Sequence, residues 1–213
     1  MNEIERPAEV IDLIDQFHGR ERALSALFVL LVMAVYLVAY FSTPLLVSTG
    51  IAIVILLIVR TPIYQSYGSI KLQTPMTETA VIESFSGPTP PVLGFQWGVA
   101  DAISIEDGTV NCETSYLFGV RSVIVAIDAT VDDTSDGKTR VTLDVTEDET
   151  PWGTYTCTIT TDGEHAIVDI DYRSNRRFGL RRLPQQLLAS RYRDAILETQ
   201  GFAVVERESH VGL

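Results

Sequence analysis

Few residues of this chain have the type and spacing that catalysis or metal binding requires. Asp169 and Asp171 share one face of a predicted strand, as paired catalytic carboxylates would, but acids at i and i+2 are also expected on the solvent face of a sheet. His165 has no nucleophile or metal ligand near it in the sequence, and with three histidines a histidine-rich metal site is not expected.

Sequence motifs for other chemistry are also missing. The chain has no phosphate-binding glycine loop, no G-x-S-x-G and no C-x-x-C. Cys112 and Cys157 lie in separate strand-like runs without metal-ligand spacing, so in a reducing compartment they are expected to be buried free thiols. The sequence therefore predicts no cofactor and favours a non-enzymatic protein, while an enzyme of unrecognised type stays open.

Arginine forms the strongest local concentration of charge. Seven of the 16 basic residues fall in one segment: Arg173, Arg176, Arg177, Arg181, Arg182, Arg191 and Arg193. In a chain of net charge −12 this segment could contact an anionic leaflet, where each basic residue contributes about 1 kcal/mol, or an acidic partner. Alternatively, the arginines pair with nearby carboxylates on a solvated helix face. The overall acidity disfavours nucleic acid as a partner.

A long apolar stretch must position everything else. Ala23–Val59 contains no Asp, Glu, Lys, Arg or His. As one helix it would be about 55 Å long, whereas the hydrocarbon core is about 30 Å thick. Because Pro44 breaks the stretch after Phe41, we expect residues 23–62 to form a two-helix transmembrane hairpin, with spans at 23–41 and 44–62.

The basic residues predict the orientation of this hairpin. Arg20 and Arg22 precede it and Arg60 and Lys71 follow it, whereas the turn at residues 41–45 has no basic residue. The positive-inside rule then places both termini and the soluble domain in the cytoplasm, attached to the lipid bilayer of the cell membrane by two helices.

The remaining segments are assigned by pattern. Residues 1–22 are expected to form an amphipathic arm with a helix from Pro7. Residues 63–78 are expected to form a linker and residues 209–213 a frayed tail. Residues 79–208 predict the cytosolic domain, opening with a strand at 79–85. The apolar run at 92–99 is compatible with either a short helix or a buried strand.

Alternating residues then predict a β-meander. Three hairpins are expected, at 101–118, 122–147 and 153–172, each with an Asp-Gly pair in its turn. A helix is expected from Pro184 to about Gln200, followed by a strand at 202–208. The predicted fold class is α+β: a transmembrane helical hairpin followed by an antiparallel meander sheet that is packed by a long C-terminal helix.

This order of elements is similar to the helix-grip (START/Bet v1-like) fold. That resemblance implies an apolar pocket between sheet and terminal helix, lined by residues such as Phe95, Trp97 and Tyr116, for a lipid or other hydrophobic ligand. Packing of these aromatic side chains in an ordinary core is the alternative. The hairpin-plus-domain layout, with RFGLRRLP before the final helix and GFAVVERES after it, also resembles small uncharacterised membrane proteins of halophilic archaea.

Two functions follow as hypotheses. The first is a membrane-anchored interaction or scaffolding domain at the inner leaflet, favoured by the hairpin and by the lack of a reaction motif. The second is a helix-grip module that binds a hydrophobic ligand. An enclosed apolar pocket would favour the second hypothesis and a filled core the first.

Overall fold

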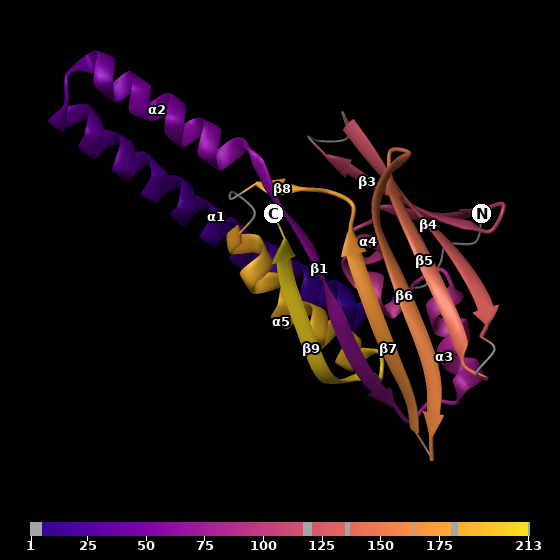
Figure 1. Cartoon of the computed structure of the whole chain (residues 1–213). Coiled ribbons are helices and arrows are strands. Elements are labelled where there is room, and N and C mark those ends of the chain that lie inside the picture. Colours follow the sequence, from indigo (N-terminus) through magenta and orange to yellow (C-terminus); the bar gives the residue numbers. More distant parts are fainter. Residues whose placement is uncertain (1–5, 117–120, 135–136, 164, 180–182, 213) are drawn as a thin grey trace.

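A computed structural model describes residues 6–116, 121–134, 137–163, 165–179 and 183–212. Its elements are α1 (Ala8–Ser42), α2 (Leu45–Arg60), β1 (Pro62–Thr74), α3 (Glu78–Ser86), η1 (Pro91–Leu93), α4 (Gly94–Gly98), β2 (Ala102–Glu106), β3 (Thr109–Tyr116), β4 (Arg121–Asp133), β5 (Thr139–Glu147), β6 (Thr150–Asp162), β7 (His165–Ser174), β8 (Phe178–Gly179), α5 (Leu183–Thr199) and β9 (Ala203–Gly212). Helices α1 and α2 project from a domain built on one sheet (Figure 1).

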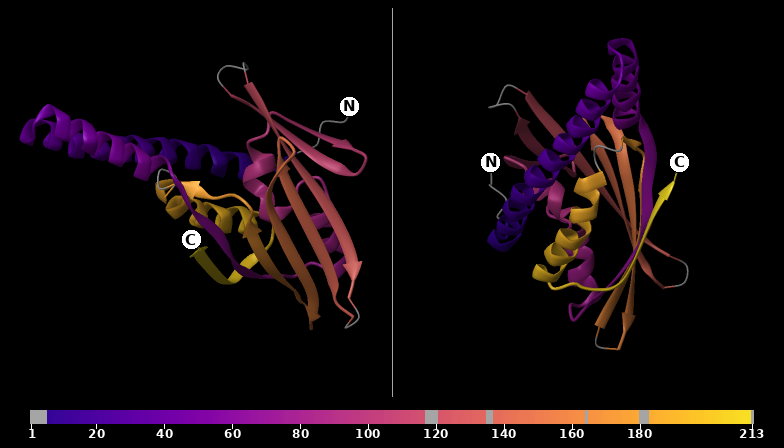
Figure 2. Two further views of the ribbon diagram at one scale, coloured as in Figure 1. Left: turned by 45° about the horizontal axis from the view of Figure 1, so that its top comes forward. Right: turned by 90° about the vertical axis from the view of Figure 1, so that its left-hand side faces the viewer.

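The sheet confirms the predicted antiparallel meander. Strands β2 to β7 pair in sequence order, and β1 follows β7 in the sheet. At the first predicted turn Asp107 and Gly108 have φ values of 50° and 88°, the left-handed conformations that a tight hairpin needs. Helices α3, α4, α5 and the first part of α1 lie on one side of the sheet (Figure 2).

The predicted linker at 63–78 is wrong, because most of it is strand β1. β1 lies between β7 and β9, with Ile70 paired to Ile170 on one side and to Arg207 on the other. Its inner face buries Ile70 and Leu72, whereas polar residues occupy the outer face. Since both partner strands lie about a hundred or more residues away in sequence, local pattern could not reveal the pairing.

Two further local predictions are corrected. Residues 209–213 were expected to be a tail, but β9 continues to Gly212, where it pairs with Gln65. The strand expected at 79–85 is helix α3, in which the Thr77 side chain caps the N-terminus by accepting from the Ala80 amide at 3.3 Å. Val81 and Phe85 then meet the core at the i, i+4 spacing of a helix. The run at 92–99, left open between helix and strand by the sequence, is helical as far as Gly98, in η1 and α4.

Helix α1 joins the predicted arm and the predicted first span without a break. Over 35 residues it is about 52 Å long. Its first turns bury Val10, Ile14 and Phe17 against the domain, and its later turns run away from it beside α2 (Figure 1). The domain and the hairpin are therefore not joined by a flexible segment at this end.

One helix of the described chain, α1, is long and apolar enough to cross a membrane. Helix α2 is apolar but shorter, at 16 residues, because it ends before Pro62. The fold thus confirms one candidate span. A second span, and with it the predicted multi-pass topology, stays a proposal.

Helix α4 is wedged between α1 and α5 through two glycines. A Cβ atom built on Gly94 would collide with Ile196 of α5, and one built on Gly98 would collide with the δ-methyl of Ile14 on α1. Trp97, between these glycines, is fully buried, and its indole N–H donates to the Pro90 carbonyl at 2.9 Å. Close packing of three helices therefore requires glycine at both positions.

We predict that Gly98→Ala lowers the free energy of unfolding by about 1–3 kcal/mol, as overpacking does in tight cores. Ile14→Val removes the δ-methyl that the new Cβ meets, so the double variant should recover much of this loss. The measurement is thermal unfolding of the full chain in detergent, followed by circular dichroism. Gly19→Ala is the control: it lies on α1 with no atom within 4 Å of the added methyl and should be neutral or stabilising. Equal melting temperatures for Gly98→Ala and the parent would contradict the docking of α1.

The two cysteines are free and buried, as the sequence predicts. They lie on the inner face of the sheet, Cys112 on β3 and Cys157 on β6. Burial raises the pKa of Cys112 from 9.0 to about 11, partly offset by Arg6, and burial raises the pKa of Cys157 as well. Both thiols are therefore protonated at neutral pH and poorly nucleophilic.

We predict that neither thiol reacts with an aromatic disulfide reagent at pH 8 until urea unfolds the chain. With a pKa of about 11, roughly one Cys112 in a thousand is thiolate at that pH. Because folding raises this pKa, the associated stability is complete below pH 9 and is lost as pH rises towards 11. The double variant Cys112→Ala, Cys157→Ala should lose less stability over that interval. Fast labelling of the folded chain would contradict burial.

A hollow under the last helix and a basic base to the hairpin

Two adjoining hollows remain between α5, α4 and the inner face of the sheet. The inner hollow has a volume of about 20 Å³ and the outer one about 60 Å³. They share a wall made by Tyr155, Tyr172 and Arg193. The inner hollow is further lined by Ile70, Pro91, Val92, Gly94, Phe95, Ile196, Leu197 and Arg207, and the outer one by Ser66, Gln96, Trp152, Gly153, Arg173, Ser174 and Phe178.

Two tyrosines on neighbouring strands stack, and one of them reaches across β1 at a glycine. The rings of Tyr155 and Tyr172 stack with centroids 6.1 Å apart, and the Tyr172 hydroxyl lies 3.0 Å from the Ser209 hydroxyl. This contact passes over Gly68, where a Cβ atom would lie 2.8 Å from the Tyr172 oxygen and closer still to the Glu208 carbonyl. Burial raises the pKa of the Tyr155 phenol, and Arg193 partly offsets this rise. Tyr155 is therefore a neutral hydrogen-bonding group at physiological pH.

Arg207 brings a cation to the inner face of β9. Its side chain is 14% exposed, and one terminal nitrogen donates to Asp194 on α5. The Nε atom is buried and has no hydrogen-bond partner in the described part of the chain. A buried charged donor without an acceptor is unfavourable. The Nε–H of Arg207 therefore lacks the hydrogen-bond acceptor that would stabilise it here. The sequence placed Arg207 on a strand but gave no sign that it faces inward.

The three predicted pocket residues are not gathered around one cavity. Phe95 borders the inner hollow and packs edge-on against Phe17 of α1, with ring centroids 4.8 Å apart. Trp97, two residues later on α4, is fully buried in the main core. The Tyr116 side chain lies outside the described residues; its backbone pairs with Arg121 at the end of β3.

The predicted arginine patch is divided among several environments. Arg176 forms a 2.5 Å ion pair with Glu147, as the carboxylate-pairing alternative expected. Arg193 lines both hollows, with its guanidinium carbon 6.0 Å from the Phe95 ring centroid. Arg173, Arg177, Arg191 and Arg193 are exposed. Arg181 and Arg182 lie outside the described residues.

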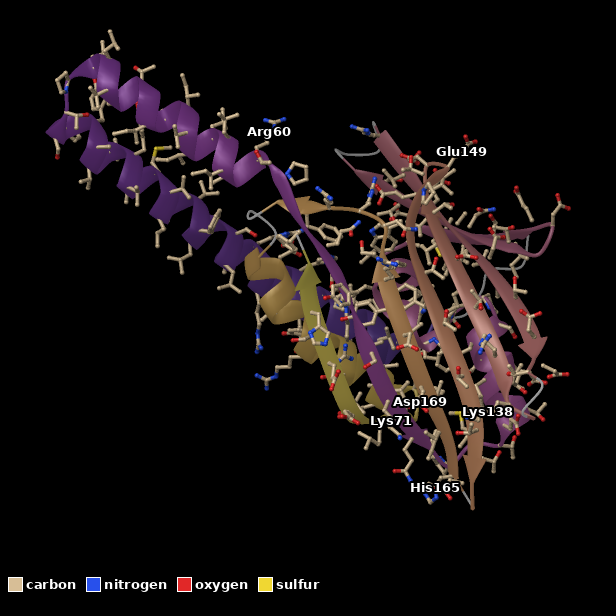
Figure 3. The ribbon with its side chains drawn as sticks, viewed as in Figure 1. Arg60, Lys71, Lys138, Glu149, His165 and Asp169 are labelled. Carbon is tan, nitrogen blue, oxygen red and sulfur yellow. The ribbon has the colours of Figure 1, made fainter. Side chains whose placement is uncertain are left out.

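Two of the exposed arginines lie towards the base of the hairpin. Arg177 precedes β8, whose Phe178 pairs with Tyr64 of β1, and Arg173 pairs with Tyr67 further along β1. Arg60, the last residue of α2, lies at the same end of the domain (Figure 3). Cationic and aromatic side chains thus meet where the hairpin joins the sheet.

The hairpin itself presents apolar side chains to its surroundings. Leu31 is 60% exposed, Val38 67% and Leu57 59%, and many of its other large apolar residues are similarly exposed. An apolar groove of about 650 Å³ runs between α1 and α2. Exposure of this much contiguous apolar surface marks a membrane or protein contact.

The remaining candidates for chemistry do not assemble. Asp169 points outward beside Lys71, at 3.9 Å, in an exposed ion pair across β1 and β7 (Figure 3). Asp171 is on the same outer face, and His165 lies at the distal turn. No cluster of three or more His, Cys, Asp or Glu suited to a metal occurs among the described residues.

Comparison with known proteins adds only weak structural likenesses. No protein-family model matches the chain, and no curated protein matches it. Similar solved structures include a conserved protein from Geobacillus kaustophilus (14% identity, TM-score 0.42, covering 68% of this chain and 99% of that one), Mll3558 from Rhizobium loti (16%, 0.40, 65% and 96%) and Ara h 8.0201 (7%, 0.40, 64% and 97%).

Nothing about binding or activity follows from likenesses at this level. The helix-grip order of a first strand, short helices, a meander and a long helix is seen directly in β1, α3, α4, β2 to β7 and α5. Helix α1 and strand β9 are additions to that order. The resemblance to membrane proteins of halophilic archaea stays a prediction.

Proposed function

We propose that this chain is a membrane-anchored protein whose helical hairpin holds a helix-grip domain against the cytoplasmic face of the bilayer, where the domain acts as an interaction or scaffolding module. The observation that carries the proposal is the exposed apolar surface of the hairpin, including Leu31, Val38 and Leu57. In water this surface would be unfavourable by about 25 cal/mol per Å², and lipid removes that penalty.

Connectivity supports two crossings rather than one. The first turns of α1 and the whole of β1 belong to the same domain, because Val10 and Leu72 lie in one core. A chain that crosses the bilayer along α1 must therefore return along α2 to reach β1. At 16 residues α2 is about 24 Å long, short of the usual 30 Å, and local thinning of the bilayer accommodates such a mismatch.

The basic residues support a cytoplasmic domain. Arg20, Arg22 and Arg60 lie at the domain end of the hairpin, whereas the turn between α1 and α2 has none. The exposed Arg173 and Arg177 add to the positive charge at that end. This distribution follows the positive-inside rule and places the arginines near anionic lipid headgroups.

The two connections restrict how the domain moves at the membrane. Helix α1 continues unbroken into the core, and only Thr61 separates α2 from β1. A domain held at two rigid points keeps one orientation and presents one set of surfaces to the cytoplasm. Such presentation suits a scaffold, and among the described residues no reaction constellation competes with that role.

The alternative function, binding of a hydrophobic ligand, stays a prediction and requires a larger pocket than the structure contains among its described residues. Ligand pockets for drug-sized molecules have volumes of about 300–1,000 Å³. The hollows under α5 have volumes of about 20 and 60 Å³. A lipid-sized ligand would thus require α1, α4 or α5 to move away from the sheet.

We predict that an impermeant thiol reagent applied to intact cells labels Ser42→Cys but not Asp162→Cys. Ser42 is exposed at the turn between the two helices, and Asp162 is exposed at the distal end of the domain. Both substitutions are made with Cys112 and Cys157 replaced by alanine. The measurement is the labelled fraction before and after cells are permeabilised.

Permeabilisation should make position 162 reactive, which controls for steric protection. Labelling of position 162 in intact cells would place the domain outside and reverse the proposed orientation. Recovery of the chain in the soluble fraction after carbonate extraction would overturn membrane anchoring itself.

A further inference from the structure

We propose that the double hollow under α5 binds a small oxyanion, a phosphate or carboxylate group, between Arg193 and Arg207. The site is formed by α5, β9 and the paired tyrosines of β6 and β7. It belongs to the domain and not to the hairpin, so the inference holds whether or not the hairpin enters a membrane.

Charge is the first argument. The chain has 28 acidic and 16 basic residues. Yet the described lining of the two hollows contains Arg173, Arg193 and Arg207 and no Asp or Glu. Asp194, which lines neither hollow, neutralises Arg207, so Arg193 is the lining arginine shared by both hollows that has no such ion pair among the described residues. A cationic hollow in an acidic domain attracts anions by its local potential.

Hydrogen bonding is the second argument. The buried Nε of Arg207 has a proton to donate and no acceptor among the described residues. Tyr155 and Tyr172 border the same hollow, and Gln96 borders the adjoining outer hollow; all three bring further donors. An anion accepts from all of these groups, and hydrogen bonds between a guanidinium and an anionic oxygen are among the strongest in proteins.

Size is the third argument. About 10–15 Å³ of such free space holds one water molecule. The inner hollow, at about 20 Å³, therefore has room for one oxygen atom beside Arg207, and the outer hollow, at about 60 Å³, has room for the rest of a small oxyanion beside Arg193. A nucleotide or an acyl chain is too large. The outer hollow also reaches Ser66 and Phe178, near the base of the hairpin, so the group could come from a free ion or from a lipid headgroup.

Tryptophan fluorescence can report whether the hollow is occupied. It has two tryptophans; Trp152 borders the outer hollow, whereas Trp97 is fully buried in the core. The full chain in neutral detergent is titrated with inorganic phosphate, with chloride as the balancing anion at constant ionic strength. We expect a saturable change in tryptophan emission and a rise in melting temperature, with the emission change absent in Trp152→Phe.

A matched pair of variants tests the assignment. Arg193→Gln removes a cation that lines both hollows, and Arg191→Gln removes another exposed arginine, two residues earlier, that lines neither. We expect phosphate to bind roughly tenfold or more weakly to the first variant and unchanged to the second, as expected for loss of one charge-assisted hydrogen bond. Arg207→Met is combined with Asp194→Asn, so that no carboxylate is left unpaired, and it should also weaken binding.

The outcomes separate the sources and the alternatives. If phosphatidylglycerol in the micelle suppresses the phosphate response, the natural group is a lipid headgroup; if it does not, the natural group is a free ion. The absence of any phosphate-specific change, or an equal response in Arg193→Gln and Arg191→Gln, would overturn the proposal and leave water as the occupant.

Discussion

The insertion of the first turns of α1 into the domain is the contact on which the rest of the structure depends. Val10 and Ile14 are buried in the core of the domain, beside Gly98 of α4. The same helix then forms the long arm of the hairpin. Because α1 is one unbroken helix, the way its first turns pack in the core also determines the direction in which the hairpin leaves the domain.

Local pattern was sufficient for the meander and the last helix. Asp-Gly turns and strict alternation depend on neighbouring residues, and the hairpins at β2 to β7 followed them. Pattern failed at β1, where the mixed sequence PIYQSYGSIKLQT becomes a strand because β7 and β9 pair with it. It failed at α3 as well, since a Thr cap and two i, i+4 apolar residues within a short segment also fit a strand.

The candidate site was largely beyond the sequence. The pairing of β9 with β1 has an irregularity between Lys71 and Leu72, so the inward position of Arg207 could not be derived from alternation. The cluster of arginines was visible in the sequence, yet their partners were not. Glu147 and the hollow that receives Arg193 come from segments far from these arginines in the chain.

The position of β1 has a consequence for biosynthesis. β1 is translated directly after the hairpin, but its partners β7 and β9 emerge about a hundred or more residues later. Likewise, α1 is synthesised well before α5, the helix that it packs against. Non-local pairing of this kind folds slowly. The apolar hairpin is therefore complete long before the domain can close, and the face of α1 that packs on α5 remains uncovered until α5 is made. If the proposed anchoring holds, insertion into a bilayer precedes folding of the domain.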